Sequence, residues 1–233
     1  MLIGLRSRLR AERSEPQIDS IAIPDSLSSW PVHPSATSIF KRCLDIIGGA
    51  IGLLITLLLL LPIAVAIQLD DPGPVFYSQL RCGYRGRTFR IWKFRSMVTN
   101  ADRLKHQVEN QAQGLIFKNE NDPRITRVGR FLRRTSLDEF PQFWNVLRGD
   151  MSLVGTRPPT LDEVSQYAPH HWQRLNVKPG LTGRWQVQGR SHVKDFETIV
   201  KMDLDYQAQW SVGHDVALIW QTIGSVVLSR GAY

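Results

Sequence analysis

The most prominent pattern along the chain is an apolar run at residues 46–67, which contains no charged residue. A helix of that length covers about 33 Å, enough to cross the hydrocarbon core of a bilayer. A buried core helix is the alternative interpretation, but helices of soluble proteins are usually shorter than this run. We therefore predict a membrane segment here.

The topology of this segment depends on one proline and on the charges at its ends. Pro62 lies inside the run, where it removes a backbone hydrogen bond and favours a bend. Basic residues flank both ends of the run: Lys41, Arg42, Arg81, Arg85 and Arg87. Because positive charge on both sides favours neither orientation, we expect a helix that enters the membrane, bends at Pro62 and returns to the same face. A kinked helix that spans the membrane is the alternative.

After a run of structure-breaking residues at 70–74, the chain has the pattern of a soluble domain. Residues 75–79 and 88–94 have the composition of strands, and the glycine-bearing loop between them predicts a β-hairpin. Lys93 and Arg95 are one strand period apart and should share a face. That face is either a binding surface or a charged edge exposed to solvent, which protects against aggregation.

Helical patterns predict four further helices, over residues 97–113, 160–176, 195–210 and 214–228. Thr160 and Glu163 have the spacing of a capping box at the start of the second. The last helix is apolar with few charges, which favours a position in the membrane interface. His170 and His171 are adjacent, and adjacent side chains on a helix point apart. We therefore expect them at the surface and not as shared metal ligands.

Two adjacent carboxylates, Asp138 and Glu139, stand at the expected start of a short amphipathic helix. A purely structural explanation exists, since Ser136-x-x-Glu139 fits a capping box and acidic groups in a first turn are favoured by the helix dipole. In that interpretation one stripe of side chains is buried: Leu137, Phe140, Trp144 and Leu147. A functional interpretation is favoured by the arginines around the pair: Arg130, Arg133, Arg134, Arg148 and Arg157.

Arginine recurs at every third position upstream of these carboxylates, at Arg124, Arg127, Arg130 and Arg133. A solvated helix face or attraction to anionic lipid explains such a pattern, each arginine near a membrane surface being worth about 1 kcal/mol. A phosphate-binding role is the more specific interpretation, because guanidinium groups match phosphate oxygens bidentately. In that case the arginines hold a diphosphate next to Asp138.

Composition and charge narrow the classes of partner. The 233 residues carry a formal net charge of +8 with a pI near 9.9, which favours nucleic acid, phospholipid or phosphorylated substrates. The two cysteines have no metal or disulfide spacing, which favours a reducing compartment. Residues 1–37, basic and then rich in Pro and Ser, are expected to form a disordered arm. The membrane helix at 38–70 and a soluble domain at 71–233 follow.

Six short motifs occur in order along the chain: Lys41-Arg42-x-x-Asp45, Gly73-Pro74-Val75-Phe76-Tyr77, Lys93-Phe94-Arg95-Ser96-Met97, Thr135-Ser136-Leu137-Asp138-Glu139, Pro179-Gly180-Leu181-Thr182-Gly183 and Gly189-Arg190. Jointly, over residues 38–230, they resemble the bacterial sugar transferase family, the monotopic polyprenyl-phosphate phosphoglycosyl transferases. Two positions depart from the family pattern. Thr156 occupies the position of the first proline in the Gly-Pro-Arg-Pro sequence that is common in the family. Leu61 occupies the position of the serine that often precedes the proline of the membrane helix.

The element pattern and this resemblance together imply an α+β fold. We expect a mostly helical cytoplasmic domain with a small β-hairpin, anchored to the bacterial inner (plasma) membrane by the kinked, re-entrant helix and by interfacial amphipathic helices. The resemblance implies transfer of a phosphosugar from a nucleotide diphosphate sugar, usually a UDP-sugar, to polyprenyl (undecaprenyl) phosphate. This releases UMP and initiates polysaccharide or glycan assembly.

By residue match, the resemblance assigns Asp138 as the nucleophile of a covalent intermediate, close to a Mg²⁺ ion, with Glu139 as its partner. It points to further substrate-binding residues: Lys93, Arg95, Arg133, Arg157, Arg190 and Asp203. The resemblance allows three kinds of partner: membrane lipid, a second copy of the chain and downstream glycosyltransferases. It implies no nucleic acid partner. From the residues alone, two other classes stay open: a membrane-anchored nucleic-acid-binding protein and a non-catalytic scaffold of a polysaccharide export complex.

Overall fold

The computed structural model describes residue 24, residues 26–188, residue 193 and residues 195–227. The described α-helices are α2 (Ser26–Ser29), α3 (Pro34–Thr37), α4 (Ile39–Asp70), α5 (Arg127–Arg134), α6 (Phe143–Arg148), α7 (Leu161–Val164), α8 (Arg184–Gln188), α9 (Phe196–Ala208) and α10 (Val212–Val227). The strands are β1 (Phe76–Cys82), β2 (Thr88–Phe94), β3 (Ser152–Val154) and β4 (Gly180–Thr182). The 3₁₀ helices are η2 (Tyr84–Gly86), η3 (Lys105–Gln107), η4 (Leu137–Gln142) and η5 (Pro169–Leu175). This part of the chain is mostly helical with a small amount of sheet, as predicted.

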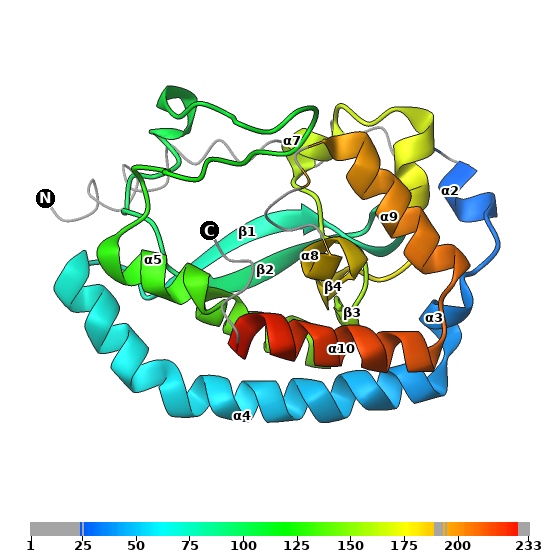
Figure 1. The fold of residues 1–233 in the computed structure, drawn as a ribbon, viewed down its shortest axis with the longest axis horizontal. Helices are drawn as coiled ribbons and strands as arrows, with labels where there is room; N and C mark the ends of the chain where they lie inside the picture. Colours follow the sequence, from blue (N-terminus) through cyan, green and yellow to red (C-terminus); the bar gives the residue numbers. More distant parts are fainter. Residues whose placement is uncertain (1–23, 25, 189–192, 194, 228–233) are drawn as a thin grey trace, which may run out of the picture.

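Helix α4 contains the whole predicted apolar segment and runs along one edge of the molecule (Figure 1). It begins after Ser38, whose hydroxyl oxygen accepts a hydrogen bond from the Lys41 N–H at 3.3 Å. Pro62 lies within the helix, and Figure 1 shows that α4 bends towards its C-terminal end. A proline explains such a bend because it removes one hydrogen bond of the helix. By length and composition, α4 is the one described helix that meets the requirement for crossing a membrane.

One face of α4 is apolar and exposed. The exposed side chains recur along the whole helix: Ile47, Ile51, Leu54, Leu57, Leu58, Leu61, Val65 and Leu69. Helices α5, α6 and α10 expose further apolar side chains: Phe131, Trp144, Val216, Trp220 and Ile223. Because soluble proteins rarely expose contiguous apolar patches larger than a few hundred Å², this face of α4 requires an apolar cover.

The opposite face of α4 carries glycines and packs against the elements that follow the two carboxylates. A Cβ atom at Gly52 would lie 2.4 Å from the ring of Phe143, so only glycine fits there without a shift of α6. Small residues of this kind allow helix backbones to approach closely. The Thr56 hydroxyl adds a polar contact, since it donates to the carbonyl oxygens of Gly52 at 2.7 Å and Phe140 at 3.2 Å.

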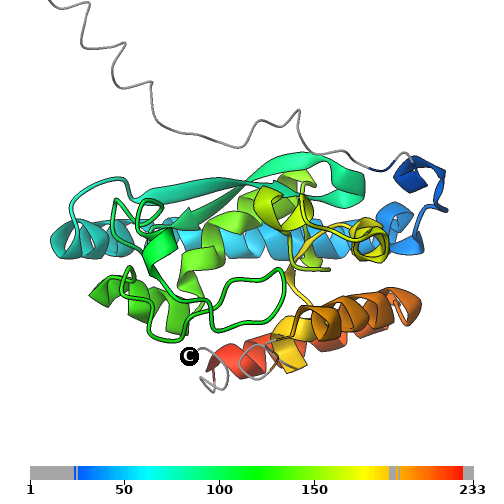
Figure 2. The same cartoon turned by 90° about the horizontal axis from the view of Figure 1, so that it is seen from above.

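The predicted hairpin is present, and its first strand ends three residues later than expected. β1 and β2 pair antiparallel over their full length, and Figure 2 shows the hairpin and the α9–α10 pair on opposite sides of the molecule. A second sheet pairs β3 with β4 in parallel. Here Gly155 and Gly180 allow two backbones to meet, because a Cβ at Gly180 would lie 2.1 Å from the Gly155 nitrogen. The glycines of the Pro179–Gly183 motif therefore serve backbone packing.

Residues 26–37 belong to the packed structure, which differs from the disordered arm expected up to residue 37; residues 1–23 and 25 lie outside the described part. Leu27 is buried in an apolar cluster with side chains of α7 and η5. The Trp30 carbonyl accepts from Arg85 at 2.6 Å, and His33 Nε2 lies 3.0 Å from the Gln207 carbonyl oxygen. The apolar residues of this segment are isolated in a polar run and form no periodic pattern. The sequence therefore does not indicate that residues 26–37 pack against the rest of the structure.

Two of the four predicted helices are wrong in extent. Residues 97–113 form turns and the short η3, because their charge pairs are worth only tenths of a kcal/mol and no continuous apolar stripe is buried there. Residues 160–176 divide into α7 and η5, the second beginning at Pro169. The predicted capping box is present, with the Thr160 hydroxyl oxygen accepting from the Glu163 N–H at 3.1 Å. Helices α9 and α10 lie within two residues of their predicted ends.

A buried ion pair attaches the start of α4 to the C-terminal helices. Lys41 Nζ lies 2.6 Å from Asp215 Oδ2, and the two side chains are 4% and 0% exposed. Lys41 also donates to the Val154 carbonyl oxygen at 2.9 Å. The Tyr206 hydroxyl and the Trp210 indole N–H both donate to the Asp215 carboxylate, at 2.8 and 3.0 Å. Helices α4, α9 and α10 and strand β3 are thus joined at one point.

We expect Asp215→Asn to lower the free energy of unfolding by about 3–5 kcal/mol, because it leaves the Lys41 ammonium buried without a counter-charge. Thermal and denaturant unfolding of the purified protein measure this change. The exposed pair between Lys105 and Asp162, 53% and 59% exposed, provides a control. Asp162→Asn should change the free energy by less than about 1 kcal/mol, and equal effects of the two variants would contradict the prediction.

Candidate active site

β2 and η4 bring the first charged groups of the site together. The Lys93 ammonium donates to Glu139 Oε1 at 2.7 Å, and both side chains are one-quarter exposed. Asp138 precedes Glu139 and is buried, with 5% of its surface exposed. Lys93 therefore contacts the second of the two carboxylates, and its predicted substrate-binding role stays a prediction.

The carboxylates reach this place through a sharp turn at Ser136, which has a φ of 56°. This left-handed conformation costs a non-glycine residue about 1–2 kcal/mol. The turn separates α5 from η4 and replaces the extended N-cap conformation that a capping box needs. The predicted capping box is therefore wrong, since the Ser136 side chain makes no cap hydrogen bond. The predicted buried stripe is also wrong in part, because Trp144 is 48% exposed and Val146 is fully buried.

A cavity of about 180 Å³ lies beside this ion pair. Its walls come from the hairpin, from η4, from residues 116–118 and 157–158, and from β4 and α8. Segments far apart in the sequence therefore enclose it, and the β3–β4 pairing brings the last of them into place.

The cavity is basic, with Arg81, Lys93, Lys118 and Arg157 in its lining against the carboxylate of Glu139. Burial and the neighbouring Arg157 guanidinium lower the pKa of Arg81 to about 10, which leaves the group charged at neutral pH. Several cations in a partly enclosed cavity favour an anion with many oxygens, such as a diphosphate.

Glu163 fixes the orientation of Arg157. The Arg157 Nη1 atom lies 3.2 and 3.1 Å from the two oxygens of the Glu163 carboxylate, which also accepts from the Thr160 N–H at 2.9 Å. Burial opposes ionisation of Glu163, but the guanidinium groups of Arg157 and Arg81 hold its pKa below the ordinary value of 4.5. The capping box of α7 thus also positions a cation of the cavity.

Arg133 and Arg95, both expected to bind substrate, are not among the lining residues of this cavity. Arg133 Nε donates to the Ser96 hydroxyl at 3.0 Å. The Arg95 guanidinium pairs with the Asp71 carboxylate at 2.7 Å and also donates to the Asp71 carbonyl. These contacts tie α5 and the end of α4 to the segment that follows β2.

Asp203, also expected at the site, does not line the cavity. It is buried on α9, and burial raises its pKa although it forms an ion pair with Arg174 at 2.5 Å. Arg174 also donates to the Tyr167 hydroxyl at 2.8 Å, so this group of side chains fixes η5 against α9. Arg190, the remaining predicted site residue, lies outside the described residues.

Most lining residues are missing from the sequence-based prediction, among them Arg81, Lys118, Gln142 and Trp185. Arg81 follows the apolar run and is explained there as a membrane flank, whereas Lys118 lies in a segment without periodicity. Gln142 and Trp185 carry no charge, so a pattern of phosphate-binding residues does not include them. A 3₁₀ helix at η4 would have indicated Gln142, because side chains three apart on such a helix lie above one another and Glu139 precedes it by three.

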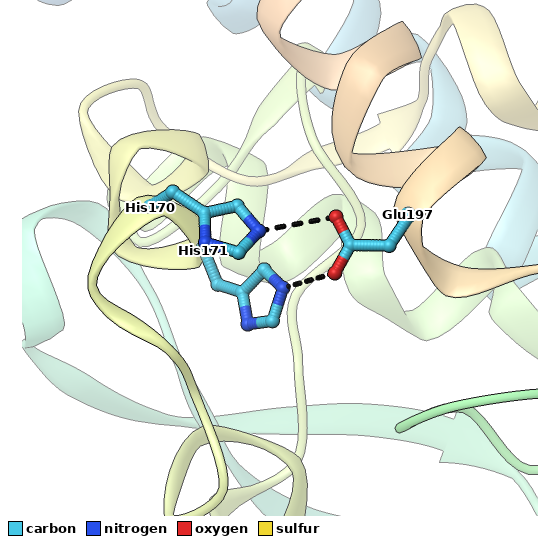
Figure 3. Close-up of side chains that lie close together, drawn as sticks. All are labelled: His170, His171 and Glu197. Carbon is cyan, nitrogen blue, oxygen red and sulfur yellow. Dashed lines mark hydrogen bonds and ion pairs between the residues drawn. The ribbon is translucent and has the colours of Figure 1, made fainter.

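A second polar cluster lies away from this cavity. Among the described residues, His170, His171 and Glu197 form the one group with suitable spacing for a metal ion. Both rings point at the carboxylate, with Nε2–oxygen distances of 3.1 and 2.7 Å (Figure 3). The expectation that the histidines point apart is therefore wrong, because both rings of η5 converge on the Glu197 carboxylate of α9.

The hydrogen bonds of this cluster argue against metal binding. The Ala168 N–H donates to His171 Nδ1 at 2.9 Å, so the proton of the neutral ring is on Nε2. That nitrogen then has no lone pair for a metal and donates to Glu197 instead. The cluster braces η5 against the start of α9.

The fold and the cavity thus describe a domain with a basic cavity and an adjacent carboxylate pair, built on one long apolar helix. The model of one protein family, the bacterial sugar transferases, matches residues 36–229. The chain belongs to the bacterial sugar transferase family.

Three curated relatives illustrate the range of this similarity. The chain is 50% identical over 196 residues to the galactosyl transferase CpsE of Streptococcus agalactiae, covering 83% of this chain and 43% of the relative. It is 39% identical over 203 residues to the UDP-glucose:undecaprenyl-phosphate glucose-1-phosphate transferase of Escherichia coli, covering 84% and 42%. It is 38% identical over 199 residues to the exopolysaccharide production protein ExoY of Rhizobium meliloti, covering 83% and 88%. The chain thus spans less than half of the first two and most of ExoY.

We expect Glu163→Gln to lower the free energy of unfolding at pH 7 by about 3–5 kcal/mol, because Arg157 loses its buried partner. The pKa of Glu163 is lower in the folded than in the unfolded state, so its contribution is complete above pH 4.5 and is lost as the pH falls through the folded-state value. The difference between wild type and variant should therefore shrink below pH 4.5. Denaturant unfolding at several pH values measures it, and a constant difference would contradict this assignment.

Proposed function

We propose that this chain is a phosphoglycosyl transferase, which moves a phosphosugar from a UDP-sugar to polyprenyl phosphate and releases UMP. The observation that carries the proposal is the position of Glu139 in the lining of a cavity with four cationic side chains, directly after the buried Asp138 in the chain. The relatives support the reaction class, since one is named for transfer of glucose 1-phosphate from UDP-glucose to undecaprenyl phosphate. Another is named a galactosyl transferase, so the proposal does not specify the sugar.

Asp138 is the nucleophile in this proposal. One carboxylate oxygen attacks the phosphorus that carries the sugar, the bond from that phosphorus to the UMP oxygen breaks, and UMP leaves with the electron pair. An oxygen of polyprenyl phosphate then attacks the same phosphorus and restores the Asp138 carboxylate. Phosphoryl transfer depends mainly on positioning and on stabilisation of charge, and Lys93 and Arg157 are placed to supply both.

The donor set fits Mg²⁺ as the cofactor. The Glu139 carboxylate lines the basic cavity and follows Asp138 in the chain, and Mg²⁺ is usually held by one or two carboxylates together with substrate phosphates. In the proposal Asp138 is the ligand, and Glu139, held by Lys93, lies next to it. When bound, the ion screens the repulsion between carboxylate and diphosphate and stabilises charge on the phosphate oxygens.

The exposed stripe of α4 connects this site to a lipid-linked acceptor. The Phe140 carbonyl of η4 accepts a hydrogen bond from Thr56 of α4, so η4, which carries both carboxylates, contacts the apolar helix directly. In the proposal α4 lies in the bacterial plasma membrane with the domain on its cytoplasmic face, and Trp220 of α10 lies at the level of the headgroups. Polyprenyl phosphate then reaches Asp138 without leaving the bilayer. Initiation of an exopolysaccharide or related glycan is the proposed role.

We expect Asp138→Asn to abolish UMP release, because the amide keeps the shape of the side chain and removes the charged nucleophile. Wild-type protein incubated with a UDP-sugar and Mg²⁺, without acceptor, should carry a phosphosugar adduct on the peptide that contains Asp138. The adduct should disappear when polyprenyl phosphate is added, and initial rates should follow ping-pong kinetics. Peptide mass spectrometry and a UMP-release assay over several UDP-sugars measure these outcomes.

The exposed Asp102 supplies the control, since Asp102→Asn should retain full UMP release. Rates that require a ternary complex, with no adduct on any peptide, would show direct transfer between the substrates and leave Asp138 only a metal-binding role.

We expect both ends of α4 to lie on the cytoplasmic side of the membrane. Single cysteines at the exposed positions Thr37 and Arg87, in a background with Cys43 and Cys82 replaced, test this directly. In intact cells neither position should react with an impermeant thiol reagent, and both should react after permeabilisation. Labelling of one position in intact cells would show that α4 crosses the membrane.

A further inference from the structure

Three N–H groups in the lining of the basic cavity have no hydrogen-bond acceptor among the described residues. They are Gln142 Nε2, Trp185 Nε1 and Arg81 Nε, and each of these atoms is buried. Gln142 is only 3% exposed. Buried polar groups without partners are rare in folded proteins and destabilise them. Three in one cavity indicate that the cavity is built to hold a molecule rich in acceptor oxygens.

Two of these donors are uncharged, which distinguishes them from the cations around them. Phosphate oxygens are bound preferentially by charged donors such as Arg81, Lys93 and Arg157, because charge-assisted hydrogen bonds are the stronger ones. The amide of Gln142 and the indole of Trp185 suit neutral acceptors, such as hydroxyl oxygens. The Gln142 side chain also has a carbonyl oxygen, so it can accept from the same hydroxyl groups to which it donates.

The position of Gln142 on η4 indicates which part of the substrate it meets. Asp138, Glu139 and Gln142 lie on one 3₁₀ helix with a rise of about 2.0 Å per residue, so Gln142 is about 8 Å along the axis from Asp138. Glu139 and Gln142 are three residues apart and present their side chains to the same cavity. The sugar is bonded to the attacked phosphorus through one oxygen, whereas the nucleobase is separated from it by a second phosphate and a ribose.

We propose that Gln142 and Trp185 hydrogen-bond the hydroxyl groups of the transferred sugar and so determine which sugar the enzyme accepts. This inference rests on the proposed function. It assigns the cations of the cavity to the diphosphate and the neutral donors to the sugar. Discrimination of this kind is effective, because a substrate that lacks the matching hydroxyl leaves a buried donor unpaired.

The test uses Gln142→Met and Trp185→Phe, which keep most of the side-chain volume and remove the N–H donors. Each variant should lower kcat/KM for the preferred UDP-sugar by about tenfold or more. Inhibition by the product UMP should change by less than twofold, because UMP lacks the sugar. With UDP-deoxysugars that each lack one hydroxyl, one analogue should react equally well with wild type and variant, which identifies the hydroxyl that the residue binds.

Asn145→Leu is the matched control, since Asn145 is 1% exposed and its amide donates to the Arg90 carbonyl at 2.8 Å. This variant should lower the unfolding temperature and leave the preference among sugars unchanged. Gln142→Met should not lower the unfolding temperature of the substrate-free protein, because no acceptor in the described structure is lost.

Several results would overturn the inference. One is an unchanged kcat/KM in the Gln142→Met variant. Another is a parallel loss of UMP inhibition, which would place Gln142 at the nucleotide. The third is a fall in stability as large as that of Asn145→Leu. The proposed function is tested separately by the wild-type protein. If it released UMP from no UDP-sugar, direct binding of UDP-sugars and UMP by calorimetry would still show whether Gln142 contacts the sugar.

Discussion

The buried pair of Lys41 and Asp215 is the interaction on which the arrangement of the molecule depends. It joins the first turn of the long apolar helix to the C-terminal helices at a point where β3 also supplies an acceptor. Asp45, one turn further on, accepts from the Ser152 hydroxyl and the Leu153 N–H, both at 2.8 Å. Because an unpaired charge in such surroundings is costly, the helix has one position in which all these groups are satisfied.

From this attachment, close packing carries the geometry to the site. Gly52 lets α6 approach the helix, and the Thr56 hydroxyl contacts the backbone of η4. The turn at Ser136 then directs the carboxylates towards β2, where Lys93 meets Glu139. The two carboxylates are thus positioned by a series of contacts with the apolar helix.

The sequence predicts the features that depend on local pattern and fails where distant segments meet. The apolar helix, the hairpin and the capping box of Thr160 and Glu163 follow from composition and spacing. The left-handed turn at Ser136 and the parallel contact at Gly155 are set by tertiary packing, so no local pattern indicates them. The same holds for the site. Charged residues are recognisable in the sequence, whereas neutral Gln142 becomes a lining residue of the cavity only through the fold.

The two faces of α4 have a consequence for how this protein comes into being. Its inner face carries Lys41 and Asp45, whose partners are supplied by segments more than a hundred residues later in the chain. Its outer face is a stripe of leucine and isoleucine that water does not stabilise. During synthesis the helix therefore emerges before the groups that pair with its inner face and without a cover for its outer face. If that cover is lipid, as proposed, membrane insertion and folding are coupled and are completed only when α10 is made.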